Sequence, residues 1–283
     1  MRKWCLFLSL YMVVCLLAAC GAGAGGPVKG GVTDGAVSGS AVSGEPAGAA
    51  QSEAEQAAAA VITCRVVSCG MEDSVLLAEA EGSGVFTLSL KDLPLTKDGR
   101  PWGDGDSVQG GDLVDIGYSG VILETWPGQL QGAAWADVRS DGRDSLCALY
   151  LQVLEDLWAV DSGLNNEITM VGVDLSATSL TDSERAAVAW AFAAAHGKEL
   201  VEGTWQELGE RGYIDTENLL WKDGCHFSIT EKEMEGTYFA RTVAFDAQKW
   251  RSGLGAYYFA DCTSVQAQNG LWQGYNIGAE AIS

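Results

Sequence analysis

The clearest hydrophobic pattern in the chain is a helical stripe over residues 146–158. Its large apolar residues recur every three or four positions and so fall on one helix face: Leu146, Leu149, Tyr150, Val153, Leu154, Leu157 and Trp158. Two further helices are indicated at 181–184 and 204–207, where Thr is followed three residues later by Glu. That spacing is the capping box that begins a helix, and Gly197 and Gly212 supply the matching stops.

Strand-like segments follow and surround these helices. They are rich in β-branched and aromatic residues and cover 168–175, 225–230, 238–245, 255–266 and 271–277. Three helices packed on one face of a four- or five-stranded antiparallel sheet would account for this order. We therefore expect an α+β domain with an antiparallel sheet over residues 144–283.

The region before this domain has a different pattern, with short apolar runs broken by turn residues. Strands are predicted at 61–67, 74–80, 84–90 and 112–118, and Asp98-Gly99 and residues 103–106 have turn chemistry. Short strands punctuated by glycine are typical of a small β barrel. Residues 61–143 are therefore predicted to form an all-β domain.

The first residues have the three-part layout of a secretory signal peptide over residues 1–19. Arg2 and Lys3 precede an apolar stretch, which is short for a spanning helix, and small residues lead to Cys20. The ending Leu17-Ala18-Ala19-Cys20 resembles a bacterial lipobox. The resemblance implies that Cys20 is lipidated and becomes the new N-terminus. The alternative is an ordinary secreted protein with a chance cysteine after the cleavage site.

Residues 20–60 are almost entirely Gly, Ala, Ser and Val after the cysteine, and they have no repeating apolar face. Chains of this composition are flexible and disordered, and a tether of this length reaches about 35 Å. Two acyl chains hold a protein stably on a membrane. We expect a protein anchored to the extracytoplasmic face of the cell membrane by its lipid.

The all-β region also carries a family resemblance. The residues at 111–116, Tyr118, Gly120 and 124–128 read G-D-L-V-D-I, Y, G and E-T-W-P-G. Together they resemble a family of small OB-like lipoprotein domains of Gram-positive bacteria that has no assigned activity. The resemblance covers roughly residues 61–138 and implies an OB-like barrel.

Charge and cysteine usage narrow the function classes. Loss of the leader leaves 15 basic and 38 acidic residues, a net charge of −23. So acidic a chain is unsuited to nucleic acids or anionic lipid head groups, which Lys and Arg bind.

Five cysteines remain besides Cys20, an odd number that leaves at least one thiol free. Cys225 and Cys262 are candidates for a pair, and small buried hydrophobic residues are the other interpretation.

No catalytic residue, metal site or cofactor is predicted. His196 is expected to end a helix, where a cation suits the helix dipole. His226 follows Cys225 on a strand, and their side chains point to opposite faces, so Cys225 and His226 cannot act as a catalytic pair. Acidic residues in the β region are the one calcium candidate, although their spacing matches no EF-hand and turn-forming Asp is common: Asp98, Asp104, Asp106, Asp112 and Asp115.

Aromatic and basic residues give the candidate ligand-binding positions Trp126, Trp250, Arg251 and Tyr257. Arg and large aromatic residues are the types that anchor binding surfaces. Each position also has a structural interpretation, as a plug at a strand end for Trp126 and as a tight turn with a core tryptophan for Trp250.

These patterns favour a lipid-anchored extracytoplasmic protein that binds an unidentified protein or small molecule and is not an enzyme. The alternative is an extracytoplasmic hydrolase that acts on wall glycan or peptide through paired carboxylates. A solute-binding protein is a third hypothesis. The short length of the chain and its lack of alternating strands and helices argue against it.

Overall fold

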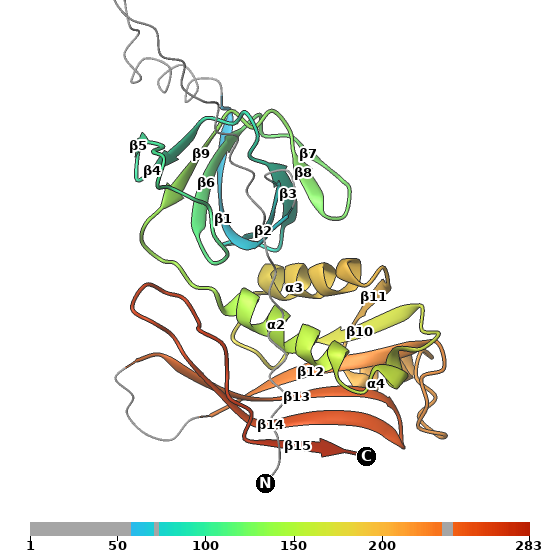
Figure 1. Ribbon diagram of the computed structural model, residues 1–283. Coiled ribbons are helices and arrows are strands. Elements are labelled where there is room, and N and C mark those ends of the chain that lie inside the picture. Colours follow the sequence, from blue (N-terminus) through green and yellow to red (C-terminus); the bar gives the residue numbers. More distant parts are fainter. Residues whose placement is uncertain (1–57, 71–73, 234–239) are drawn as a thin grey trace, which may run out of the picture. The chain divides into compact units, whose positions relative to one another are not determined.

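The computed structural model describes residues 58–70, 74–233 and 240–283 (Figure 1). The expected signal peptide, Cys20 and nearly all of the expected tether lie outside these residues. In the described part of the chain, no helix has the length and apolar character needed to cross a membrane. Helices and strands carry the labels of Figure 1, in which the first described helix is α2.

The first half of the described chain forms a mixed sheet of nine strands. These are β1 (Ala60–Cys69), β2 (Ser74–Glu79), β3 (Val85–Ser89), β4 (Leu95–Lys97), β5 (Arg100–Pro101), β6 (Leu113–Tyr118), β7 (Ile122–Leu123), β8 (Gly128–Leu130) and β9 (Trp135–Arg139). The strand order is β5-β4-β9-β6-β1-β2-β3-β8-β7. The expected barrel is not closed, because β5 and β7 remain at the two edges of the sheet.

Strand alternation builds the core of this sheet. On β1 the side chains of Cys64 and Val66 are buried, and they pack with Leu77 of β2 and with Val114 and Ile116 of β6. The central strands β9-β6-β1-β2-β3 are antiparallel, whereas β8 and β4 add in parallel to β3 and β9. Strand β6 occupies the segment that its alternating pattern predicted.

The second half contains three α-helices and a six-stranded sheet. The helices are α2 (Leu146–Ala159), α3 (Asp182–Ala195) and α4 (Trp205–Glu210), with a short 3₁₀ helix at Ser162–Asn165. The strands are β10 (Met170–Asp174), β11 (Glu199–Glu202), β12 (Gly224–Lys232), β13 (Thr242–Ser252), β14 (Gly255–Val265) and β15 (Ala279–Ile282). Their order is β11-β10-β12-β13-β14-β15.

The expected antiparallel sheet is wrong for the first three of these strands. β10 is parallel to both β11 and β12, while β12 to β15 are antiparallel to one another. The helix α3 between β10 and β11 returns the chain to the same end of the sheet, which is the geometry of a parallel crossover. The strand expected at 271–277 is instead a connection, with positive-φ glycines at Gly270 and Gly274 and isolated bridges at Trp272 and Asn276. Of the strand expected at 238–245, residues 238 and 239 lie outside the described residues.

The helices cover both faces of the second sheet, whereas one covered face was expected. Val171 and Val173 of β10 pack in the same cluster as helices α2 and α3. On the opposite face, a Cβ at Gly172 would lie 2.9 Å from Leu208 of α4 and 2.7 Å from Trp221. Glycine therefore lets α4 and Trp221 lie directly on β10.

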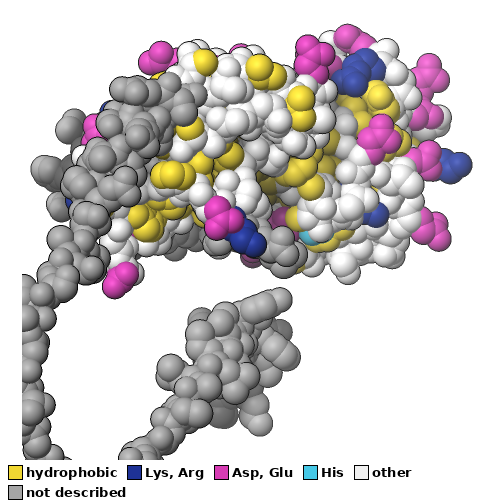
Figure 2. All heavy atoms as spheres, turned by 90° about the horizontal axis from the view of Figure 1, so that it is seen from above, with side chains coloured by type: hydrophobic (Ala, Val, Ile, Leu, Met, Phe, Trp, Pro, Cys, Tyr) yellow, Lys and Arg dark blue, Asp and Glu magenta, His cyan; other side chains and the backbone are white. Residues whose placement is uncertain are grey.

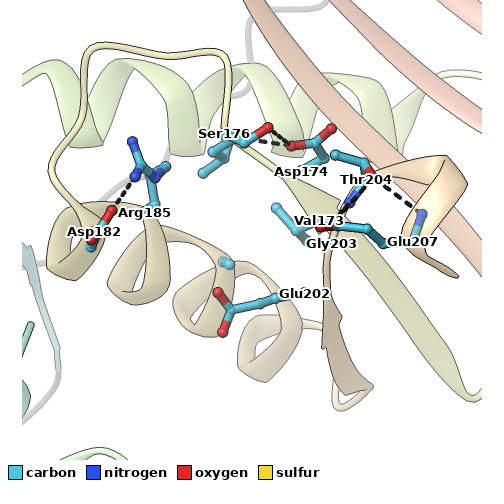
Figure 3. Close-up of a pocket in the computed structure, with 11 residues that line it drawn as sticks. Val173, Asp174, Ser176, Asp182, Arg185, Glu202, Gly203, Thr204 and Glu207 are labelled. Carbon is cyan, nitrogen blue, oxygen red and sulfur yellow. Dashed lines mark hydrogen bonds and ion pairs between the residues drawn. The ribbon is translucent and has the colours of Figure 1, made fainter. Parts of the chain in front are cut away.

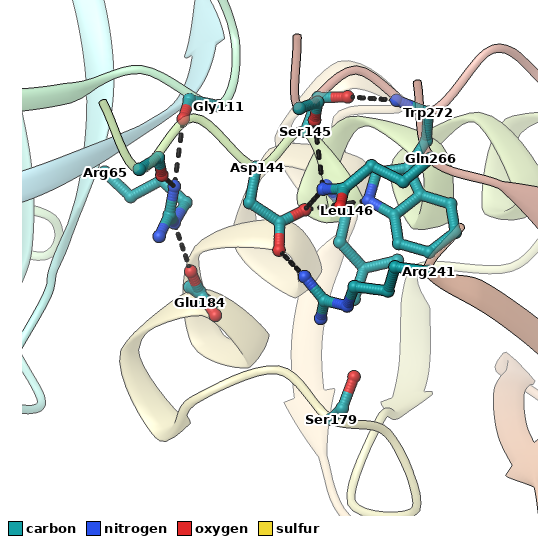
Figure 4. Close-up of polar contacts among 12 residues, drawn as sticks. Arg65, Gly111, Asp144, Ser145, Leu146, Ser179, Glu184, Arg241, Gln266 and Trp272 are labelled. Carbon is teal, nitrogen blue, oxygen red and sulfur yellow. Dashed lines mark hydrogen bonds and ion pairs between the residues drawn. The ribbon is translucent and has the colours of Figure 1, made fainter. Parts of the chain in front are cut away.

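Asp144 organises the junction between the two halves (Figure 4). Its backbone amide donates to Gly111 O of the first half at 3.0 Å. Its carboxylate accepts hydrogen bonds from Leu146 N (3.1 Å), from Trp272 Nε1 (2.7 Å) and from the Arg241 guanidinium. Arg65 of β1 also donates from Nε to Glu184 of α3 at 2.7 Å. These bonds connect the first sheet, the start of α2 and the segment after β14.

Candidate ligand-binding site

A crevice opens at the carboxyl ends of the parallel strands β10 and β11. The chain leaves β10 toward α3 on one face of the sheet and leaves β11 toward α4 on the other face. Neighbouring strands whose connections diverge in this way leave a gap between them, and open α/β sheets bind their ligands there. The gap is the topological switch point of this sheet.

The structure has a pocket of about 260 Å³ at this place (Figure 3). Its walls come from the ends of β10 and β11, from the N-terminal half of α3 and from the first turn of α4. The lining residues are Val173, Asp174, Leu175, Ser176, Asp182, Arg185, Ala189, Glu202, Gly203, Thr204 and Glu207. A pocket of this size suits a small ligand, since drug-sized ligands occupy about 300–1,000 Å³.

Most polar groups of the pocket wall are already engaged by the protein. Asp174 Oδ1 accepts from Ser176 N (2.9 Å) and from Ser176 Oγ (2.6 Å). Glu207 Oε2 accepts from Thr204 N (2.8 Å) and Thr204 Oγ1 (3.0 Å), which completes the capping box of α4 and lowers the pKa of Glu207. Arg185 donates to Leu180 O at 2.7 Å and forms an ion pair with Asp182.

Glu202 is the exception. No hydrogen bond or ion pair engages its carboxylate within residues 58–70, 74–233 and 240–283, and Figure 3 shows it at the pocket wall apart from the other polar groups. Strand alternation places Leu200 and Glu202 on the same side of β11, and Leu200 packs with the cluster that contains α3. The Glu202 residue is exposed at the pocket mouth, and partial desolvation by the surrounding atoms raises its pKa.

The charges of the pocket favour a positively charged ligand. Four carboxylates line it, from Asp174, Asp182, Glu202 and Glu207, against one guanidinium from Arg185. Next to it, His226 donates from Nε2 to Gly203 O at 3.1 Å, and burial lowers its pKa, so it adds no positive charge near neutral pH. A small ligand with an ammonium group matches this excess of carboxylates and the free Glu202 carboxylate.

Of the four ligand-binding residues predicted from sequence, Trp250, Arg251 and Tyr257 lie on the paired strands β13 and β14, whereas Trp126 lies in the first half of the described chain. Trp126 lies on the connection from β7 to β8 in the first half, with 56 % of its surface exposed. Trp250 is buried and packs edge-to-face on Trp205, with the ring centroids 5.6 Å apart. The Tyr257 hydroxyl donates to Glu280.

Arg251, the fourth of these residues, is held by the main chain. Its guanidinium donates to Leu164 O (3.1 Å), to Asn166 O (2.7 Å) and to Lys222 O (2.9 Å). Its neighbour Lys249 is fully buried and donates to Val160 O at 2.8 Å, just beyond the end of α2. Both side chains therefore donate their hydrogen bonds to backbone carbonyl oxygens among the described residues.

The acidic residues considered for calcium are mostly engaged by protein groups. Asp106 pairs with Arg100, Asp112 with Arg143, and Asp115 accepts from Thr63 Oγ1 at 2.6 Å. In the part of the chain that the structure describes, no group of three or more His, Cys, Asp or Glu side chains is arranged to hold a metal ion.

The cysteines and histidines take structural positions. Cys64, Cys69, Cys147, Cys225 and Cys262 are all free thiols, so the candidate pair of Cys225 and Cys262 is not formed. Burial raises the pKa of Cys64 and Cys225 to about 12, which keeps both protonated. His196 caps the end of α3 as expected, stacks on Trp158 at 3.9 Å and lies 3.0 Å from Glu155 Oε2.

Sequence reasoning missed this pocket, although the signal for it is present. Both capping boxes, at Thr181 and at Thr204, follow shortly after a strand. A helix that starts just after a buried strand indicates a parallel crossover, and its first turn lies at the ligand-binding edge.

Comparison with family models, with curated proteins and with solved structures gives no match for this chain.

Proposed function

We propose that this chain is a lipid-anchored, extracytoplasmic binding protein that holds a small cationic ligand in the pocket between β10 and β11. The lipobox-like sequence at Cys20 and the tether after it support the location. The pocket at the switch point supports the binding activity. The observation that carries the proposal is the Glu202 carboxylate, which lines the pocket and has no protein partner among the described residues.

The pocket sets the class of ligand. Its free acceptor and its excess of carboxylates attract a cation, and opposite charges in a partly desolvated pocket interact more strongly than in bulk water. The small volume limits the ligand to a compact group such as an amine or the side chain of a basic peptide. An anionic ligand would meet four carboxylates in the same space.

The first half of the chain belongs to this proposal as an OB-like domain of the lipoprotein family that it resembles. The five antiparallel strands β9-β6-β1-β2-β3 support this assignment. In this view it is the part of the fold nearest in sequence to the anchor, and the pocket lies in the part that follows.

The proposed pocket is tested by calorimetry with spermidine, choline and lysine as probes. Glu202→Gln is nearly isosteric, and Glu199→Gln is the matched control because Glu199 is exposed on the same strand and does not line the pocket. We expect at least one probe to bind wild type and the control equally, and to bind Glu202→Gln at least tenfold more weakly. Equal binding to all three proteins, or no binding of any probe, would count against the proposed ligand class.

The proposed location is tested separately. Mass spectrometry of the protein released from cells should show a diacylated Cys20, and Cys20→Ala should move the protein from the membrane to the medium. A soluble wild-type protein would contradict the anchor and leave the pocket experiment unaffected.

A hydrolase that works through carboxylates is the second candidate. The raised pKa of Glu202, in the same pocket as the carboxylate of Asp174, is the observation in its favour, because a general acid needs a protonated carboxyl. Release of product from a wall glycan or peptide by wild type, abolished in Glu202→Gln, would favour it over simple binding.

A further inference from the structure

A stretch of apolar side chains is exposed on the hairpin formed by β7 and β8. Every residue from 121 to 126 is exposed. The four large apolar ones, here called the apolar hairpin, are Val121 (55 % exposed), Ile122 (39 %), Leu123 (43 %) and Trp126 (56 %). These four residues lie within six consecutive positions of one edge hairpin, and clustered exposed apolar residues mark an interaction site more often than single exposed residues do.

The apolar hairpin is held away from the core by its own hydrogen bonds. Strand β7 is an edge strand that pairs only with β8, and β8 pairs in parallel with β3. The turn is closed by Thr125, whose hydroxyl donates to Pro127 O at 2.7 Å and whose amide donates to Leu123 O at 2.8 Å. A Cβ at Gly128 would lie 3.1 Å from Phe86, so the returning strand is packed against β3.

The chain enters the fold beside this hairpin. Residues 1–57 precede the described part, and Ala59 N donates to Tyr118 O at 2.9 Å. A Cβ at Gly120 would lie 3.8 Å from the Cβ of Ala60. The start of β1 therefore adjoins the connection that leads from β6 into the apolar hairpin (Figure 1). Seen from above, hydrophobic side chains gather in patches on this end of the molecule, and most visible acidic side chains lie toward its rim (Figure 2).

We propose that the apolar hairpin docks on the lipid surface that holds the protein's N-terminus. This proposal rests on the proposed lipid anchor, because the anchor supplies the nearby membrane. Tryptophan and large aliphatic side chains are the residues that settle at the membrane interface. The tether expected over residues 20–60 would hold the hairpin at a high local concentration near the bilayer, so that a small apolar surface suffices for contact.

The charge near the hairpin specifies the lipid. Residues 119–127 contain one charged side chain, Glu124, and no Lys or Arg. Anionic head groups attract basic segments and repel an acidic protein. The hairpin is thus suited to zwitterionic lipid such as phosphatidylcholine.

The test uses tryptophan fluorescence of the whole chain from Gly21 onward, attached by an N-terminal histidine tag to phosphatidylcholine vesicles that contain a nickel-chelating lipid. Brominated phosphatidylcholine quenches tryptophans that enter the interface. Of the tryptophans in the described residues, Trp126 alone is in the exposed class, so it dominates the quenching. This attachment replaces the native anchor, and failure of the lipidation at Cys20 would therefore leave the test valid.

We expect vesicle quenching of wild type and its loss in Trp126→Phe, which removes the reporter. Leu123→Glu should also abolish quenching, because it places a charge in the docking surface. Leu123 is exposed, so this substitution should leave the packing of the core intact. Leu254→Glu is the matched control, since Leu254 is 92 % exposed on the β13–β14 turn, and it should be quenched like wild type.

Three results would overturn the proposal. The first is wild-type quenching no greater than that of Trp126→Phe, and the second is quenching that Leu123→Glu leaves unchanged. The third is a wild-type dimer in solution that Leu123→Glu converts to monomer without any lipid quenching, which would assign the hairpin to contact with a second copy.

Discussion

Removal of the Asp144 side chain should destabilise the whole described fold, because this carboxylate joins segments that are distant in sequence. The change Asp144→Ala leaves three donors without their acceptor: Trp272 Nε1, the Leu146 amide in the first turn of α2, and the Arg241 guanidinium. Gln266 Nε2 also donates to Asp144, but it retains Gly270 O at 3.2 Å.

The contributions differ because the burial of the donors differs. Trp272 is buried, and an unsatisfied buried donor costs about 2 kcal/mol. Loss of the hydrogen bond to the first helical amide costs about 1 kcal/mol. The Arg241 side chain is 51 % exposed and regains water, so its share is small. The sum is about 3 kcal/mol, which lowers the melting temperature by roughly 6–12 °C in a unit of this size.

The assay is urea unfolding of wild type, Asp144→Ala and Asp144→Asn, followed by tryptophan fluorescence and circular dichroism. Asp144→Asn keeps an acceptor oxygen for Trp272 and Leu146, and it should cost only about 1 kcal/mol. Equal stabilities of the two variants would refute the reasoning, because the loss would then come from the charge and not from the buried donors.

Three further predictions test the backbone and the pocket. Gly111→Ala should destabilise the fold by about 3 kcal/mol or more, because φ is +90° and the new Cβ would lie 2.7 Å from backbone atoms of Asp144 and Ser145. Gly99→Ala, where φ is +72° and the space around the new Cβ is open, should cost about 1 kcal/mol. Similar urea midpoints for the two variants would contradict this. Thr181→Ala should cost about 1 kcal/mol through loss of the α3 capping box, whereas Thr181→Ser should be nearly neutral, as measured by thermal unfolding. The fold raises the pKa of Glu202, so the native state binds a proton more tightly than the unfolded state, and the stability of the wild type falls as pH rises through that pKa. Glu202→Gln lacks this titration and should therefore gain stability relative to wild type from acidic to neutral pH. A difference in urea midpoints that stays constant with pH would contradict this.

Local signals in the sequence predicted the helices well. The capping boxes at Thr181 and Thr204 form as expected, and the apolar stripe of α2 is buried apart from its last member, Trp158, which is half-buried. These features depend on residues within one or two turns of each other. Gly197 and Gly212 also take the positive φ that ends α3 and α4.

Features that depend on distant residues were not predicted. The parallel pairing of β10 with β11 and β12 depends on the order of strands and helices along the chain, which the pattern within any single segment does not show. Lys249 is similar: it is close in sequence to the candidate binding residues Trp250 and Arg251, but its ammonium group lies against the end of α2, 2.8 Å from Val160 O. The partner is 89 residues away in the sequence, and nothing in either segment alone indicates the contact.

The pocket was missed for the same reason. Asp174 is distant in the sequence from Glu202 and Glu207, and each of the three is an ordinary acidic residue in its own segment. The switch point brings them to one crevice, and only the fold distinguishes the unpartnered Glu202 from the carboxylates that accept hydrogen bonds from Ser176 and Thr204.

Native mass spectrometry of the protein purified gently from its own membrane tests the pocket most directly. The wild type and Glu199→Gln should both carry a small bound molecule that Glu202→Gln lacks. The same adduct on all three proteins, or no adduct on wild type together with no binding of any cationic probe, would contradict the proposal that this pocket binds a small cation through Glu202.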